Sequence, residues 1–190
     1  LSGTGLLRRG SGHAGTAPAQ YRPTTTLVRD YHNFGFDMSR SDDTPNFAYT
    51  DSTDWINWND LYGSYTDLGY RINACIQFNG YHDSSNWRDP AADAKAYGRA
   101  FATAFGPTHG SGVVDTVQIG NEPGSKMSDS LFHTVFENMA EGIREIDPDL
   151  KIVTPYVKVG GGNNYAKDIA LFSDITHLVD AYAAQMEEHT

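Results

Sequence analysis

Residues 113–123 have the sequence Val-Val-Asp-Thr-Val-Gln-Ile-Gly-Asn-Glu-Pro. The first seven of these residues are largely apolar and β-branched, which predicts a buried strand that stops at Gly120. Asn121, Glu122 and Pro123 follow at once, so a carboxylate lies directly beyond the carboxyl end of this strand. In sheets of parallel strands, ligand-binding and catalytic groups gather at that edge.

Outward from this stretch, strand and helix patterns alternate along the chain. Short apolar, β-rich runs predict strands at residues 26–31, 71–78, 113–119, 151–157 and 178–184. Apolar residues at spacings of three and four predict helices at residues 54–68, 89–105, 128–146 and, more weakly, 165–172. This alternation is typical of parallel strands joined by helices, either in an open doubly wound sheet or in a closed eight-stranded barrel.

The composition predicts one domain. Residues 1–25 are rich in Gly, Ser, Thr and Pro, so we expect an irregular segment there and a folded domain at residues 26–190. No apolar run is long enough to span a membrane. The sequence does not fix the compartment, and of the possibilities we favour secretion or an extracellular location.

Charge and cysteine content limit the partners and cofactors. The chain has 24 acidic and 14 basic residues and a formal net charge of −10, so we expect no nucleic-acid partner and favour a neutral substrate. Cys75 is the only cysteine, lies in an apolar run and is expected to be a small buried side chain. The glycine-rich residues 160–164 lack the lysine and threonine of a phosphate loop. The acidic residues at 42–43 and 51–54 do not have the spacing of a Ca²⁺ loop. We expect neither a metal nor a cofactor.

Glu122 is the residue on which a chemical role depends. Pro123 restricts its predecessor to extended dihedrals, which fixes the direction in which the glutamate side chain leaves the backbone. Alone, the tripeptide Asn-Glu-Pro is a weak indicator, because it occurs by chance in roughly a few per cent of chains of this length. Its position at the end of an apolar strand in an alternating chain makes it a considerably stronger one.

Two stretches resemble a known group of enzymes. Residues 114–123 resemble the acid/base signature on the fourth strand of clan A glycoside hydrolases, a large set of retaining (β/α)-barrel enzymes. Residues 27–32, Leu-Val-Arg-Asp-Tyr-His, followed by Phe-Gly-Phe-Asp-Met at 34–38, are similar to the second-strand region of the β-xylosidase and α-L-iduronidase family in that clan. The resemblance implies an α/β fold of the (β/α)8 TIM barrel type. It also implies hydrolysis of O-glycosidic bonds in an oligo- or polysaccharide by a retaining double displacement.

The resemblance implies roles for two carboxylates. Glu122 would protonate the leaving oxygen and then deprotonate the attacking water, while a glutamate at the end of the seventh strand would form the glycosyl-enzyme. If Glu122 follows the fourth strand, Lys151 begins the fifth and Leu178 the sixth. We therefore expect these residues to form an incomplete barrel. The nucleophile and the remaining strands would come from unrecorded sequence or from another chain.

The resemblance also implies residues that bind the sugar. It places Arg29 and His32 close to the catalytic carboxylates, with Arg29 holding the nucleophile ionised, and it matches His189 to a histidine of the family. Asn121, beside Glu122, would hydrogen-bond a sugar hydroxyl. The structural alternatives are a surface-pointing arginine on an edge strand and a histidine that satisfies a loop.

Position along the chain suggests four further candidates. Asn79 and Tyr81 follow one predicted strand, and Tyr156 lies at the end of another, so all three should approach the rim that carries Glu122. Trp87 is in a predicted loop and is a candidate for stacking on a sugar ring. For each of them, an ordinary loop or core position is the alternative.

Two other functions remain open. A catalytically inactive glycosidase-like barrel would bind polysaccharide or serve in assembly, and an unclosed barrel would expose strand edges that pair with other chains. In an unrelated open-sheet protein, the Asn-Glu-Pro tripeptide would be a coincidence. A second glutamate whose carboxyl group lies about 5 to 5.5 Å from that of Glu122 would favour the retaining hydrolase.

Overall fold

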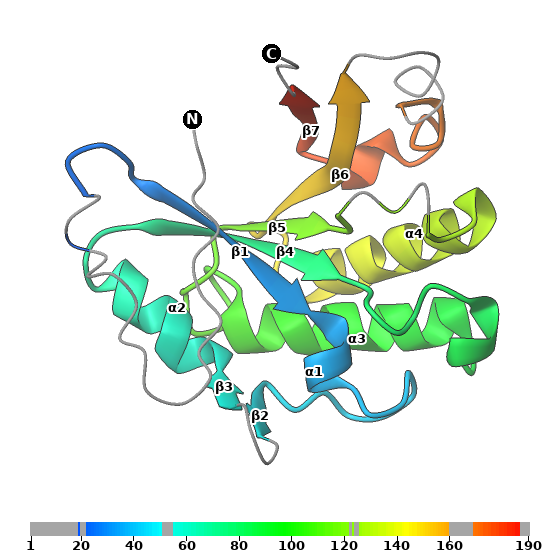
Figure 1. The fold of residues 1–190 in the computed structure, drawn as a ribbon, viewed down its shortest axis with the longest axis horizontal. Helices are drawn as coiled ribbons and strands as arrows, with labels where there is room; N and C mark the ends of the chain where they lie inside the picture. The colour runs from blue at the N-terminus through cyan, green and yellow to red at the C-terminus, as the bar shows by residue number, and fades with distance from the viewer. Residues whose placement is uncertain are drawn as a thin grey trace.

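The computed structural model describes residues 19, 22–50, 55–121, 123, 126–159 and 169–186. A five-stranded sheet forms its centre, in the order β1-β4-β5-β6-β7, and every neighbouring pair is parallel (Figure 1). Its strands are β1 (Leu27–Asn33), β4 (Arg71–Gln77), β5 (Thr116–Ile119), β6 (Lys151–Val159) and β7 (Ala181–Met186). The parallel arrangement that the alternating pattern predicts is confirmed.

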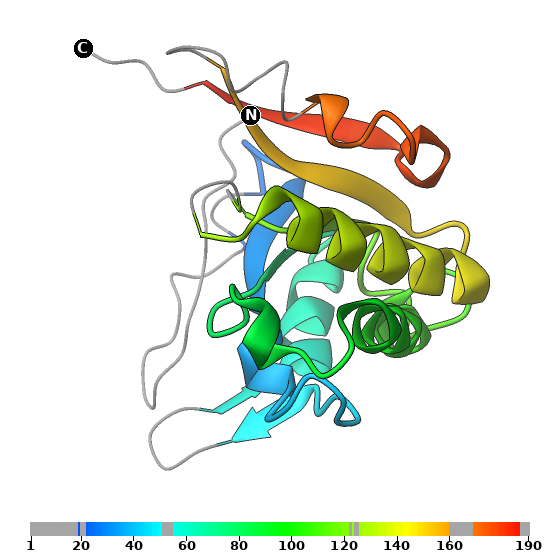
Figure 2. The same ribbon diagram turned by 90° about the vertical axis from the view of Figure 1, so that its right-hand side faces the viewer.

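Helices cover one face of this sheet. They are α1 (Phe34–Asp37), α2 (Trp58–Thr66), α3 (Pro90–Phe105) and α4 (Asp129–Ile146), with single 3₁₀ turns η2 (Ser84–Asn86) and η4 (Thr176–Leu178). Figures 1 and 2 show α2, α3 and α4 on the same side of the strands, with α3 and α4 side by side. A separate antiparallel hairpin, β2 (Ala48–Thr50) with β3 (Trp55–Asn57), precedes α2.

Local capping explains where the long helices begin. The Asp89 side chain accepts hydrogen bonds from the first-turn backbone of α3, and Pro90 occupies a position where its missing N–H costs nothing. The Ser128 side chain accepts from the backbone N–H of Leu131 at the start of α4. Both starts agree with the sequence prediction.

The start of α2 was predicted too early. Residues 55–57 pair with β2 instead of joining the helix, and the Asn57 side chain accepts from the backbone N–H groups of Asn59 and Asp60. The helix therefore begins at Trp58, while Asp54, the first residue of the predicted helix, lies outside the described residues. Pairing with the neighbouring strand β2, which the helix pattern does not reveal, decides this boundary.

Helices α3 and α4 approach each other through two glycines. A Cβ atom on Gly98 would lie 2.2 Å from the carbonyl oxygen of Met139, and one on Gly142 would lie 2.2 Å from that of Lys95. Both distances are far below van der Waals contact, so the two helices touch backbone to backbone. This close contact keeps α3 and α4 in one layer against the sheet.

Other boundaries differ from the expectation by a few residues. Strand β5 begins at Thr116 rather than at residue 113, and β7 begins at Ala181 because η4 occupies the preceding turn. Of the predicted helix at 165–172, residues 169–170 are helical and 165–168 lie outside the described residues, as does most of the irregular segment predicted at 1–25. None of the described helices is both long and apolar enough to cross a membrane.

Candidate active site at the carboxyl edge of the sheet

Strand β1 sends alternate side chains to opposite faces of the sheet. Val28 and His32 are buried on the helix side, whereas Arg29 and Tyr31 point the other way. The strand register aligns these two with equivalent positions on β4 and β5, and we call the resulting surface the polar face. It is formed by Arg29, Tyr31, Asn73, Cys75, Thr116 and Gln118.

Arg29 connects the three strands of the polar face. Its Nε donates to Gln118 Oε1 at 2.9 Å, and its Nη2 donates to Cys75 Sγ at 2.9 Å and to Asn121 Oδ1 at 2.9 Å. The guanidinium carbon lies 4.9 Å from the centre of the Tyr31 ring. Although β1 is an edge strand, the Arg29 side chain does not point freely into solvent, because it is bonded to side chains of β4 and β5 and to Asn121, two residues beyond β5.

Cys75 is buried next to this guanidinium, as the sequence predicted. Burial raises the pKa of its thiol to about 12, although the positive charge of Arg29 acts in the opposite direction. The Sγ atom therefore keeps its proton at neutral pH and lies 3.8 Å from the carbonyl oxygen of Gly120. A neutral thiol is a poor nucleophile, so the polar face does not have the chemistry of a cysteine hydrolase.

Gly120 lets the chain turn as it leaves β5. Its φ is +90°, a conformation that residues with a Cβ rarely adopt, and a Cβ there would lie 2.8 Å from the Phe132 ring. Pro123 is held from the other side, since its carbonyl oxygen accepts from the N–H groups of Lys126 and Met127, both at 2.9 Å. Asn121, bonded to Arg29, and Pro123 are thus both held in place, while Glu122 between them lies outside the described residues.

Two polar atoms of the polar face have no hydrogen-bond partner among the described residues. They are Gln118 Nε2 and Asn73 Oδ1, and both atoms are buried. Buried polar groups are nearly always satisfied by protein, water or ligand. On the polar face, one donor and one acceptor near Arg29 thus remain without a partner among the described residues.

The placement of His32 corrects the expectation that it binds sugar. Its ring is completely buried on the helix side, stacked on Trp58 with ring centres 4.1 Å apart. Its Nδ1 lies 2.9 Å from the Tyr62 hydroxyl, and its Nε2 lies 2.7 Å from Asp37 Oδ2. Both ring nitrogens are engaged within the core, so His32 cannot contact a substrate on the polar face.

Trp87 and Tyr81 are also more enclosed than expected. Trp87 is 5% exposed and Tyr81 is 8% exposed, and both rings pack on Phe34 of α1. The Trp87 indole donates to the backbone oxygen of Tyr81 at 2.9 Å, and the Tyr81 hydroxyl donates to that of Met38 at 3.0 Å. Most of each ring is covered, so the expectation that Trp87 is an open-loop platform for stacking on a sugar is corrected.

The remaining candidates are distributed as follows. Asn79 is exposed after β4, where its Nδ2 donates to Gln77 Oε1 at 3.4 Å, so it lies at the carboxyl edge of the sheet as predicted. Tyr156 belongs to β6, but its side chain is outside the part of the structure that is described, and so is the whole of His189. Of the expected binding residues, the structure joins Arg29 directly to Asn121. Within the described part of the chain, no group of three or more His, Cys, Asp or Glu side chains could hold a metal ion.

The fold defines the class of protein that the chain resembles. A parallel sheet with helices on one face is the α/β architecture of the (β/α)-barrel glycosidases. No protein-family model matches the chain, and no curated protein matches it either.

The fold of this chain is similar to those of several solved glycosidase structures. A glucosidase from Croceicoccus marinus has a TM-score of 0.63 and 17% identity, over 87% of this chain and 38% of that one. A family 39 glycoside hydrolase from Bacteroides cellulosilyticus WH2 has a TM-score of 0.57 and 12% identity, over 86% of this chain and 33% of that one. An endoglucanase from Pseudomonas stutzeri has a TM-score of 0.54 and 17% identity, over 71% and 40%. The chain spans two fifths or less of these proteins, and at such identities the likeness shows the fold alone.

Proposed function

We propose that this chain is part of a retaining glycoside hydrolase in which Glu122 is the general acid and base. The observation that carries the proposal is the 2.9 Å hydrogen bond from Arg29 to Asn121, the residue before Glu122. It ties the start of the Asn-Glu-Pro segment to the polar face at the carboxyl edge of the sheet. That edge is where barrel enzymes hold their catalytic groups.

In this proposal, the neighbouring side chains have separate tasks. The Asn121 amide oxygen is taken by Arg29, so its N–H groups are the ones that would donate to a sugar hydroxyl. Arg29 would keep a second carboxylate ionised by its charge. The unpartnered Gln118 Nε2, next to Arg29, would donate to the same polar group.

The second carboxylate would come from outside residues 1–190. Among the described residues, the polar face carries arginine, tyrosine, asparagine, cysteine, threonine and glutamine, but no aspartate or glutamate. Glu122 would first protonate the leaving oxygen while that carboxylate attacks the anomeric carbon. It would then remove a proton from the water that releases the sugar.

The test is Glu122→Gln in the full chain, assayed on glycosides with unactivated leaving groups. Loss of the proton donor should lower kcat/KM by about 10²- to 10⁴-fold without changing thermal unfolding. Glu137→Gln is the matched control, because this glutamate lies on the solvent side of α4 beside His133. Undiminished hydrolysis in the Glu122 variant would remove the assignment, and glycan binding without turnover in the wild type would favour a non-catalytic protein.

A further inference from the structure

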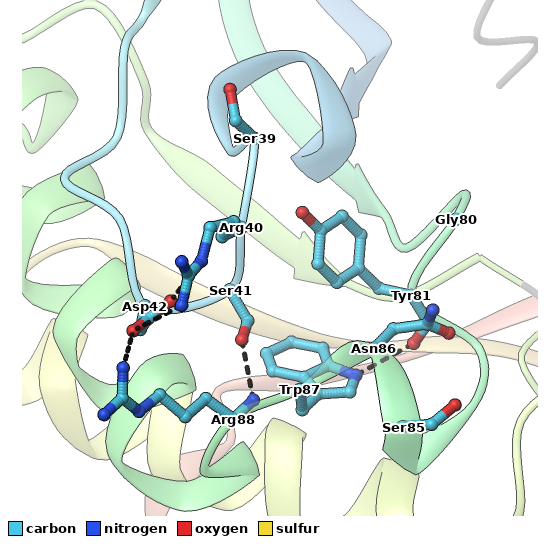
Figure 3. Close-up of a pocket in the computed structure, with 10 residues that line it drawn as sticks. All are labelled: Ser39, Arg40, Ser41, Asp42, Gly80, Tyr81, Ser85, Asn86, Trp87 and Arg88. Atoms are coloured by element: carbon cyan, nitrogen blue, oxygen red, sulfur yellow. Dashed lines mark hydrogen bonds and ion pairs between the residues drawn. The ribbon is translucent and has the colours of Figure 1, made fainter.

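The loops that follow α1 and β4 form a hollow. It is lined by residues from segments 39–42 and 80–88 and has a volume of about 390 Å³ (Figure 3). Neither Asn121 nor Arg29 lines it. It is therefore a separate feature from the polar face.

One wall of the hollow is an array of charged groups. The Asp42 carboxylate accepts from Arg40 Nε at 3.2 Å and from Arg88 Nη1 at 2.9 Å. Figure 3 shows the two arginines on either side of Asp42, with the Tyr81 and Trp87 rings forming another part of the lining. Arg40 and Arg88 supply donors on the two sides of the Asp42 acceptor. Neighbouring hydroxyl groups are complementary to this arrangement, because each hydroxyl both donates and accepts.

Asp42 stays ionised in this array. Partial desolvation would raise its pKa, but the hydrogen bond from Arg88 and the charge of Arg40 outweigh that effect and hold the pKa below its usual range. The carboxylate is thus a permanent acceptor at neutral pH. Exposed hydroxyl and amide groups of Ser39, Ser85 and Asn86 extend the polar lining.

The local charge argues against an anionic occupant. The lining itself has two arginines and one aspartate, Asp42, but three further aspartates adjoin it at positions 43, 83 and 89, and the whole chain has a formal net charge of −10. An acidic ligand would therefore approach a molecule of net negative charge. A neutral molecule rich in hydroxyl groups matches both the array and the charge.

We propose that this hollow is a second binding site, which holds a neutral sugar unit of a glycan. This inference rests on the proposed function, because that function identifies the bound molecule as a glycan. The geometry of the site is independent of Glu122, so the two can fail separately.

The experiment compares Arg88→Ala with Arg99→Ala, each combined with Glu122→Gln so that bound glycan is not consumed. The Arg88 side chain is 71% exposed, and the structural bonds of this residue to Ser41 and Asp93 come from its backbone N–H, so truncation should leave the loop intact. Arg99 is also exposed and ion-paired, with Glu145, but it lies on α3 outside the hollow. Isothermal titration calorimetry would use neutral oligosaccharides of glucose, xylose and mannose, with an oligogalacturonate of equal length as the anionic probe.

We expect Arg88→Ala to weaken binding of the best neutral oligosaccharide by about tenfold, as loss of a charged hydrogen-bond donor does, and Arg99→Ala to leave it unchanged. Asp42→Asn should weaken it to a similar extent. Equal affinities in the Arg88 and Arg99 variants, tighter binding of the anionic probe, or no binding of any neutral oligosaccharide would overturn the proposal. Hydrolysis of a single-sugar aryl glycoside by the wild type tests the proposed function separately.

Discussion

The polar groups on the two faces of β1 differ in whether all of their hydrogen bonds are made. On the helix side, Asp37 of α1 accepts from Trp58 Nε1 at 2.8 Å and from the Tyr97 hydroxyl at 2.6 Å, and it lies 2.7 Å from His32 Nε2. Every polar side-chain atom in this buried cluster has a partner. On the polar face, the Arg29 cluster leaves Gln118 Nε2 without one. Closed polar networks hold a fold together, whereas open ones mark places where a further group binds.

The largest effect on stability is expected from substitution of Asp37 in the buried cluster. In Asp37→Ala, the Trp58 indole, the Tyr97 hydroxyl and His32 would lose a shared buried acceptor, so we expect the free energy of unfolding to fall by about 3–5 kcal/mol. Denaturant unfolding measures the change. Asp67→Ala, in the exposed turn after α2, should stay within about 0.5 kcal/mol. A loss at Asp37 no larger than that of the control would mean that the network does not hold the core.

Arg29 should show the reverse balance between activity and stability. Arg29→Lys keeps the charge but loses the planar fork that joins Gln118 and Asn121, so we expect kcat/KM to fall by about 100-fold. The cost in unfolding free energy should be smaller than at Asp37, since the polar face is not enclosed by helices. Steady-state kinetics alongside denaturant unfolding gives both quantities, with Arg99→Lys as the control. A variant that loses stability and keeps its activity would show that Arg29 stabilises the fold and does not support catalysis.

The sequence predicted where two helices begin, but not on which face of β1 Arg29 and His32 lie. The starts of α3 and α4 were predictable because Asp89 and Ser128 act on their own first turns. The resemblance brought Arg29 and His32 near the catalytic carboxylates but did not assign them to faces. Residues three apart on a strand point to opposite sides, and this period alone could have separated them.

Long-range packing accounts for what was missed. Cys75 and Gln118 were not predicted as partners of Arg29, because the register of β1, β4 and β5 is not contained in any local pattern. Trp87 was predicted in an open loop, but Phe34 of α1, distant in sequence, covers its ring. Contacts between segments far apart in the chain decide burial, and a single sequence carries little information on them.

A pH-dependent effect concerns Asp30, the neighbour of Arg29 on the helix side of β1. Burial raises the pKa of its carboxyl group to about 7, while the N–H of Tyr31 and the charge of Arg29 partly oppose the shift. An acid whose pKa is raised by folding stabilises the fold below its unfolded pKa and loses that contribution as pH rises towards 7. Between pH values of about 4 and 7, this group should lower stability by at most about 1.4 kcal/mol per pH unit.

Unfolding curves of the wild type and Asp30→Asn across this pH range check the assignment. The difference in free energy of unfolding between the two proteins should change with pH up to about 7 and be constant above it. A difference that stays constant throughout would show that Asp30 does not titrate in this range.

Glu122 is proposed to act as a proton donor beyond the end of β5, and a series of aryl glycosides with leaving groups of graded acidity tests this directly. In Glu122→Gln, kcat/KM should approach the wild-type value for the most acidic phenols and fall steeply for the least acidic, because only poor leaving groups need protonation. An equal loss across the whole series would contradict the account.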